Sequence, residues 1–351
     1  MLDRFQLSEK FVGSSLLAAG TSLAEAINAF TAGIYDLLGS NGERKEQSSQ
    51  ISYSLNSLYN LTGANSVQIV FLSGVAFTIY FLIRKKKFSE REYNLFLRSV
   101  FQGKALLWSI STAELALLLG CVATSSFSSS LKIGNYNLLP CLFFLVWVLY
   151  MVFTKKTDSP EDASLEAKSY TNIFQKFGNG QFICIFLLIF VSFTGLAFWN
   201  FNLVSKFETV FKIPKNIGLG TILSLITSFP EFSSFFFLFK SRCYDTACAG
   251  LFGSALFNLM LPFFTQLIKS DWLFSSLGSN QSSLIFWLAG VLGVNLFFAL
   301  GFYTNKEGRF LVNKGNYWTL FWSGLIIIGY LLSSLVISPI LFNDVQAGVT
   351  K

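Results

Sequence analysis

Three glutamates, Glu25, Glu114 and Glu231, lie inside strongly apolar stretches of the sequence. An ionised carboxylate in the middle of a membrane helix costs about 3 kcal/mol on insertion scales, so each needs a partner, a proton or a bound cation. Two of them, Glu25 and Glu231, have Thr four residues earlier and Ser three residues earlier. These residues are Thr21, Ser22, Thr227 and Ser228. On a helix the three positions face the same way, and the pattern therefore predicts oxygen-rich clusters at the two glutamates.

A second shared pattern follows each glutamate. Gly-Ser-Ala-Leu-Phe-Asn begins at Gly253, after Glu231, and Gly-Ala-Asn-Ser-Val-Gln begins at Gly63, after Glu25. The interval from Glu25 to Gly63 exceeds that from Glu231 to Gly253 by the length of the polar insertion at 39 to 54. The sequence therefore predicts an internal repeat, with a loop added to its first copy.

Nine apolar stretches are long enough to cross about 30 Å of hydrocarbon as helices. They are residues 11 to 38, 57 to 83, 105 to 126, 135 to 153, 181 to 204, 217 to 239, 247 to 268, 283 to 303 and 318 to 338. The composition agrees, because 52% of the 351 residues are hydrophobic, only 13% are charged and 41 are Phe. We expect an all-α, multi-pass membrane protein; water-soluble chains are nearer a quarter charged, and a nucleic-acid binder needs a basic surface.

Lys and Arg are divided unequally between the alternate loops. Eighteen lie on the side of the N-terminus and eight on the other side, which predicts a cytoplasmic N-terminus and an external C-terminus by the positive-inside rule. In a prokaryote this membrane would be the plasma (inner) membrane. A polar linker at 154 to 180 separates a first membrane half, 1 to 153, from a second, 181 to 351.

The span count also relates the two copies of the repeat. The Glu25 helix is the first span and the Glu231 helix the sixth, so they cross the membrane in opposite directions and the repeats are inverted. Inverted halves with polar groups near the midplane are typical of secondary transporters. Carboxylates, hydroxyls, amide oxygens and carbonyls freed near Pro230 would form an all-oxygen site, which suits Ca²⁺ and Na⁺. The chain contains no His, which excludes imidazole centres.

These patterns resemble the alpha repeats of the cation/Ca²⁺ exchanger superfamily, in particular its sodium/calcium exchanger branch. In that family a G-T-S-x-P-E helix is followed by a G-S-N-x-x-N helix. Here the pairs read GTSLAE with GANSVQ and ITSFPE with GSALFN. The resemblance covers the four signature helices, at about 11 to 38, 57 to 83, 217 to 239 and 247 to 268, and the rest only in span count and spacing.

The resemblance implies a cation site around Glu25 and Glu231. Backbone oxygens would come from Thr21 and Thr227, hydroxyls from Ser22 and Ser228, and side-chain oxygens from Ser254, Asn258 and Gln68. The sequence departs from the pattern at five positions. Ala64 replaces a Ser, Gln68 an Asn or Asp, Ala24 the Pro, Ile226 a Gly and Ala255 an Asn.

Family members usually have ten spans, with a helix ahead of the first signature helix. Only ten residues precede Phe11 here, so this helix is expected to be missing. Either the start of the sequence is assigned too late, or the chain is genuinely shorter, or another subunit supplies the helix.

The predicted function is a secondary active antiporter, not an enzyme, that exchanges Ca²⁺ for Na⁺ by alternating access and needs no cofactor. Its expected partners are the lipid bilayer and the transported ions, with no nucleic acid. Two alternatives stay open: coupling to H⁺, and a non-transporting relative with a structural or regulatory role. For Glu114 no matching residue exists in the second half, and a hydrogen-bonded packing role is favoured over ion binding.

Overall fold

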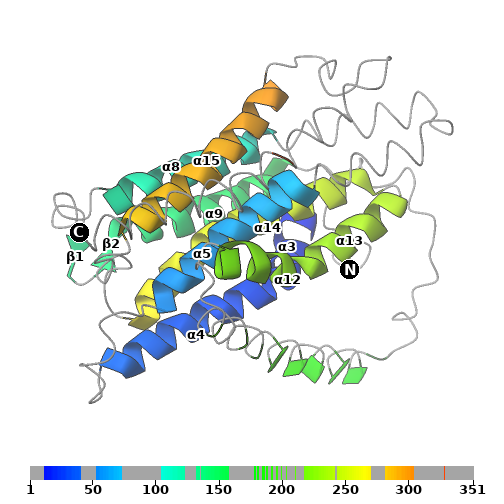
Figure 1. Ribbon diagram of the computed structural model, residues 1–351. Helices are drawn as coiled ribbons and strands as arrows, with labels where there is room; N and C mark the ends of the chain where they lie inside the picture. Colours follow the sequence, from blue (N-terminus) through cyan, green and yellow to red (C-terminus); the bar gives the residue numbers. More distant parts are fainter. Residues whose placement is uncertain are drawn as a thin grey trace.

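The computed structural model describes residues 12–40, 53–72, 104–122, 132–134, 136–157, 217–241, 243–269 and 281–303, with isolated positions at 178, between 180 and 210 and at 328. The predicted span at 318 to 338, apart from residue 328, and most of the linker at 154 to 180 lie outside these residues. The described part is a bundle of helices (Figure 1). Its only strands are β1 (Lys132–Ile133) and β2 (Tyr136–Asn137), a two-residue antiparallel hairpin.

Two broken helices carry the signature glutamates. The first consists of η1 (Val12–Leu17), α3 (Ala18–Thr21) and α4 (Leu23–Ser40), and the second of η7 (Gly218–Leu223), α12 (Ser224–Thr227) and α13 (Phe229–Lys240). Both η1 and η7 are π-helical. The start of every segment recurs at one constant offset along the chain, for example from Val12 to Gly218 and from Leu23 to Phe229. Beyond the breaks, α4 and α13 run toward opposite sides of the molecule in Figure 1.

The remaining helices surround these two. They are α5 (Tyr53–Ser66) with its π-helical continuation η4 (Val67–Leu72), α8 (Lys104–Val122), α9 (Leu138–Thr157), α14 (Tyr244–Lys269) and α15 (Gln281–Tyr303). The helix predicted to begin at residue 135 therefore begins at Leu138, because the chain before it forms the hairpin. Its third residue is Pro140, in the first turn, where a backbone N–H is not needed.

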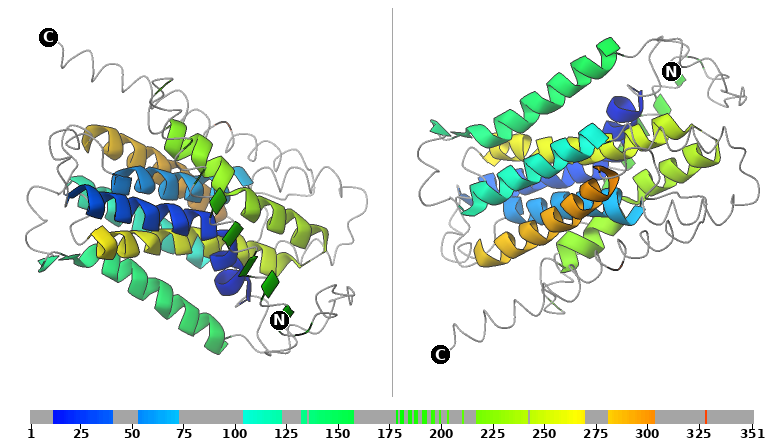
Figure 2. Two further views of the ribbon diagram at one scale, coloured as in Figure 1. Left: turned by 90° about the horizontal axis from the view of Figure 1, so that it is seen from below. Right: turned by 90° about the horizontal axis from the view of Figure 1, so that it is seen from above.

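Helix α14 occupies the centre of the bundle and packs against η1, α4, α5, α8, α9 and α13. Eighteen of its residues are buried, among them Leu251, Phe252 and Leu256. By contrast, α9 lies at the edge (Figure 2) and exposes a row of large apolar side chains. The row comprises Leu142, Leu145, Val146, Leu149 and Val152.

Two parts of the described chain are long and apolar enough to be membrane spans. One is α14, and the other is the bent pair formed by Gly218–Thr227 and Phe229–Lys240, whose axes differ by 42°. Three further apolar helices of the described chain are shorter by the same measure: Ile110–Leu119, Pro140–Val152 and Leu284–Leu296.

Candidate functional site

The helix break before each glutamate is the local feature that shapes the site. Ser22 and Ser228 stand at the breaks with similar backbone angles, φ −83° and ψ 20° against φ −81° and ψ 5°. Pro230 follows the second break, as expected for the first turn of a new helix. The first break forms without proline. Thr21 Oγ1 donates to the Leu17 carbonyl at 3.0 Å, a back-bond that bends helices.

Because of the breaks, each Thr-Ser pair serves the glutamate of the other segment. The Ser22 hydroxyl donates to Glu231 Oε1 at 2.8 Å, and Thr21 also faces this carboxyl group. In the reciprocal arrangement, Thr227 and Ser228 face the carboxyl group of Glu25. The sequence pattern predicted a cluster around each glutamate built by its own helix. That detail was wrong, because the helix does not run straight from the hydroxyls to the acid.

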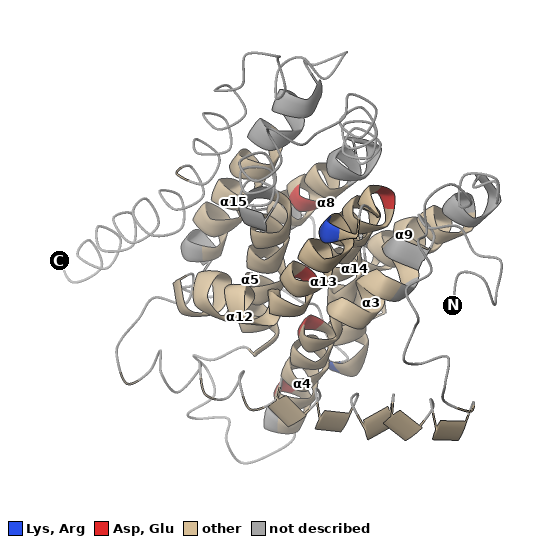
Figure 3. Cartoon of the chain, turned by 90° about the vertical axis from the view of Figure 1, so that its right-hand side faces the viewer, with Lys and Arg blue, Asp and Glu red and all other residues tan. Residues whose placement is uncertain are grey.

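The two carboxylates are close enough to act on each other electrostatically. Both are buried, with 0% of Glu25 and 2% of Glu231 exposed. Neither oxygen of Glu25 makes a hydrogen bond, and nor does Glu231 Oε2. Figure 3 shows how few charged residues the described helices contain. Three carboxylate oxygens therefore lie in the interior without a donor, an arrangement that calls for protons or a cation.

Ser254 joins the site from α14. Its hydroxyl lies 3.1 Å from Thr21 Oγ1 and 3.4 Å from the Ala18 carbonyl. Asn258, one turn further along α14, is fully buried, and its amide makes no hydrogen bond. The counterpart of Asn258 is Gln68, which is also fully buried, at the start of η4. Ser254 thus reaches the site through Thr21, which faces Glu231.

The resemblance implies a Ser at position 64, where this chain has Ala. The missing hydroxyl is replaced by that of Ser224, on the helix that packs against α5. The Ser224 hydroxyl donates to the Asn60 carbonyl of α5 at 2.9 Å. Ser224 is the counterpart of Ala18, and Ser254 is the counterpart of Ala64. One of these two serines therefore lies at each crossing, Ser224 on the broken helix at one and Ser254 on the signature helix at the other.

Glycines bring these crossings close together. A Cβ on Gly63 would overlap the Gly220 carbonyl oxygen, and a Cβ on Gly253 would lie 2.7 Å from the Ser14 backbone. Gly63 and Gly253 are counterparts in the repeat, as are Ser14 and Gly220. The backbones around the site are thus packed too closely for any side chain at the two glycines.

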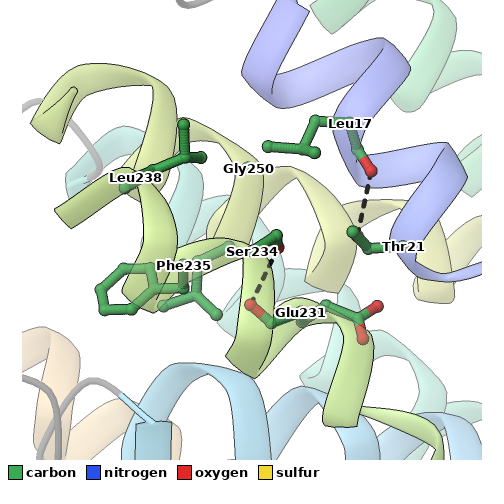
Figure 4. Close-up of a pocket in the computed structure, with 9 residues that line it drawn as sticks. Leu17, Thr21, Glu231, Ser234, Phe235, Leu238 and Gly250 are labelled. Carbon is green, nitrogen blue, oxygen red and sulfur yellow. Dashed lines mark hydrogen bonds between the residues drawn. The ribbon is translucent and has the colours of Figure 1, made fainter. Parts of the chain in front are cut away.

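A small cavity of about 10 Å³, room for about one water molecule, reaches Glu231. Leu17, Thr21, Glu231, Ser234, Leu238 and Gly250 are among the residues that line it (Figure 4). Its lining extends from Glu231 toward the turn that joins α13 to α14. Ser234 was not among the predicted site residues. Its position one turn after Glu231, on the same helix face, is the signal that could have found it.

No group of three or more Cys, Asp or Glu side chains that could hold a metal ion gathers anywhere in the described ranges. A site here would thus rest on the two glutamates and on neutral oxygens. Oxygen ligands of this kind favour hard cations such as Ca²⁺ over zinc or copper.

Comparison with known proteins gives little further identification. No protein-family model matches the chain, and no curated protein matches it. Among solved structures, the chain is similar to the crystal structure of an H⁺/Ca²⁺ exchanger, CAX, with 15% sequence identity and a TM-score of 0.48, over 98% of this chain and 89% of that chain. A likeness this weak carries no argument about function, which therefore rests on the residues of the site.

Proposed function

We propose that this chain is a membrane-embedded cation antiporter that moves Ca²⁺ in exchange for Na⁺ at a site between Glu25 and Glu231. One observation carries the proposal. Two buried glutamates come from broken helices of the same shape, and each faces the Thr-Ser pair of the other segment.

The chemistry of the site fits Ca²⁺ as the transported ion. Two ionised carboxylates supply two negative charges, which one divalent cation neutralises. Ca²⁺ takes six to eight oxygen ligands. Glu25 supplies two oxygens and Glu231 supplies Oε2, while Ser228 Oγ and Asn258 Oδ1 are buried and make no hydrogen bond. Backbone oxygens at Thr21 and Thr227 would complete the set, with Gln68 and Ser254 beside it.

The same geometry supplies a reason for exchange. When Ca²⁺ leaves, two carboxylates stay buried close together without a counter-charge, which is unfavourable. The empty site therefore has to take up another cation before the protein can change conformation. This requirement couples the movement of one ion to that of the other.

The inverted repeat would provide the two conformations. The constant offset between the segments of the two broken helices, their opposite directions and their reciprocal contacts support this interpretation. In inverted-repeat transporters one repeat rocks against the other around a central site. The cavity that leads from Glu231 toward the turn after Lys240 would be the access route on one side, which is the cytoplasmic side by the distribution of Lys and Arg.

A membrane location is supported by the composition, by α14 and by the exposed apolar row on α9. We propose nine spans, inverted repeats in the two halves and a cytoplasmic N-terminus. An extra helix or subunit beside the first span remains part of the proposal.

Coupling to H⁺ is the second candidate. The observation that favours it is that both oxygens of Glu25 are buried without a donor. A carboxyl group in this situation can be neutralised by a proton instead of by Na⁺.

Uptake of labelled Ca²⁺ into vesicles that contain the purified protein tests the proposal. We expect uptake driven by an outward Na⁺ gradient, and its loss in Glu231→Gln and in Glu25→Gln, because either change leaves one negative charge for a divalent ion. Ser233→Ala is the matched control, since Ser233 lies on the same helix with its side chain exposed. Uptake that needs a pH gradient and no Na⁺ would select the H⁺-coupled alternative.

Transport that survives both glutamine variants would disprove the site. If the wild type neither transports nor binds Ca²⁺ by calorimetry, the chain is the non-transporting relative.

A further inference from the structure

The third buried glutamate forms a separate polar cluster between helices α8, α15 and α5. Glu114 is 1% exposed. The Asn295 side-chain nitrogen donates to both of its oxygens, at 2.8 Å to Oε1 and 2.7 Å to Oε2. The side chain of Asn65 on α5 faces the same carboxyl group. Ser111, three residues before Glu114, lies on the same face of α8 and is also buried.

Among the described residues, no cation offsets a negative charge on Glu114. Helices α5 and α15 contain no acidic or basic residue. The described titratable side chains on the other two helices packed against α8 are Tyr244, Asp245, Cys248 and Lys269 of α14, and Cys141 and Tyr150 of α9. None of these acts on Glu114 electrostatically. The two neutral amides of Asn295 and Asn65 would then have to stabilise an ionised carboxylate in the apolar interior, where the cost is several kcal/mol.

The position of the Asn295 amide distinguishes a bound proton from a bound metal ion. A metal ion held by both carboxylate oxygens would occupy the place that the Asn295 nitrogen takes. A proton on one carboxyl oxygen leaves the Asn295 nitrogen in place and needs only one nearby atom that accepts its hydrogen bond. Three buried acceptor atoms that make no hydrogen bond belong to this cluster: Asn65 Oδ1, Asn295 Oδ1 and Ser111 Oγ. The Asn65 side-chain nitrogen is also buried without a hydrogen bond.

We propose that Glu114, Asn295 and Asn65 form a proton-binding site separate from the pair Glu25 and Glu231. The Glu114 carboxyl group holds a proton taken from solvent and is neutral. One oxygen accepts from Asn295 Nδ2, and the protonated oxygen donates to the Asn65 amide oxygen. Both Glu114 oxygens are then hydrogen-bonded, Asn295 Nδ2 and Asn65 Oδ1 each have a partner, and no charge is buried.

The proton site shares a helix with the proposed cation site. Asn65 lies three residues before Gln68, on the same face where α5 passes into η4. A movement of α5 that carried Asn65 away would remove the acceptor from Glu114. The proton-binding site itself does not depend on transport, so its test can succeed or fail independently of the antiporter proposal.

Infrared difference spectroscopy of the purified protein tests the site directly. We expect the spectrum of the wild type minus that of Glu114→Gln, at neutral pH, to contain the C=O stretch of a protonated carboxyl group. Asp36→Asn is the control, because Asp36 accepts from two backbone N–H groups and pairs with Lys269. Its difference spectrum should contain carboxylate bands only. Carboxylate bands in the Glu114 difference spectrum, or a conversion to carboxylate when Na⁺ is added, would overturn the proposal.

Thermal unfolding in detergent gives a second measurement. Glu114→Gln keeps an acceptor for Asn295 and a donor for Asn65, so its melting temperature should match that of the wild type. Glu114→Ala leaves the buried Asn295 amide without its acceptor and should melt at a lower temperature. If Glu114→Gln lowers the melting temperature as much as Glu114→Ala, the ionised form is the one that the fold needs, and the proposal fails.

Discussion

The reciprocal contacts between the broken helices are unequal at the level of single residues. Ser22 donates to Glu231 at 2.8 Å, whereas the Ser228 hydroxyl makes no hydrogen bond although it faces Glu25. Without a bound ion, Glu231 is thus held in place by a hydroxyl group and Glu25 is not. Glu25 is the carboxylate with more freedom to turn toward a cation.

This inequality predicts different costs for two equivalent substitutions. Ser22→Ala removes a hydrogen bond to a buried acid and should lower the free energy of unfolding of the ion-free protein by about 1 to 3 kcal/mol. Ser228→Ala removes a hydroxyl that has no partner and should cost less. Denaturant or thermal unfolding in detergent without Ca²⁺ measures both. Equal costs would contradict the asymmetry.

At the scale of helices, the close crossings position the site. Gly63 on α5 meets the backbone of η7, so the contact cannot yield by rotation of a side chain. Gly63→Ala forces α5 and η7 apart, and we expect a loss of about 3 kcal/mol or more, at or above the upper end of the usual cost of overpacking.

Gly290→Ala on α15 is its matched control, because a Cβ there meets nothing within 4 Å. The melting temperatures of the two variants in detergent give the comparison. A Gly63→Ala protein as stable as Gly290→Ala would mean that the two backbones are further apart than described.

The start of α5 is fixed from another helix. Asp36 of α4 accepts from the backbone N–H groups of Tyr53 and Ser54, at 2.9 and 3.0 Å, and lies 3.9 Å from Lys269 at the end of α14. An N-cap residue normally plays this role from the position directly before the helix. Here Asp36 plays it from the preceding helix, α4.

Replacing Asp36 should therefore cost more than replacing Lys269. Asp36→Ala leaves two helix-terminal N–H groups without an acceptor and should destabilise the protein by about 1 to 2 kcal/mol. Lys269→Ala removes the long ion pair with Asp36, a kind of contact that contributes about 1 kcal/mol or less. Unfolding free energies of the two variants test the order, and a larger loss in Lys269→Ala would refute it.

For the whole molecule, the apolar row on α9 is the surface with the clearest physical consequence. A soluble protein rarely exposes so continuous a patch, whereas a lipid-facing helix requires one. Leu145 and Leu149 are 51% and 49% exposed.

Leu145→Lys should accordingly reduce the amount of protein found in the membrane fraction, because Lys near the middle of a membrane helix costs about 3 kcal/mol to insert. Leu145→Phe serves as the control for a change of shape without charge. Quantitative blotting of membrane and soluble fractions measures the effect. Unchanged membrane levels in Leu145→Lys would mean that this face of α9 does not contact lipid.

The spacing of Thr, Ser and Glu, which recurs in both copies, predicted the two glutamates and the hydroxyls as one set, and the structure brings these residues together. The sequence could not show that the Thr-Ser pairs cross over, since a break at Ser22 is unexpected where Ala24 replaces proline. The contacts of Ser224 with Asn60 and of Glu114 with Asn295 join residues 164 and 181 positions apart. Periodicity does not reach contacts at such separations, and it does not distinguish the π-helical turns η1 and η7 from α-helix.

The different placement of the serine hydroxyls affects any attempt to rebuild the protein from duplicated halves. A chimera with two copies of the first half would contain alanine at both Ala18 and Ala64 positions, so neither junction would retain the hydroxyl of Ser224 or of Ser254. Two copies of the second half would give each junction two, from the equivalents of Ser224 and Ser254. Because Ser224 and Ser254 lie on different helices of the two crossings, one half cannot replace the other, even where their backbones have the same conformation.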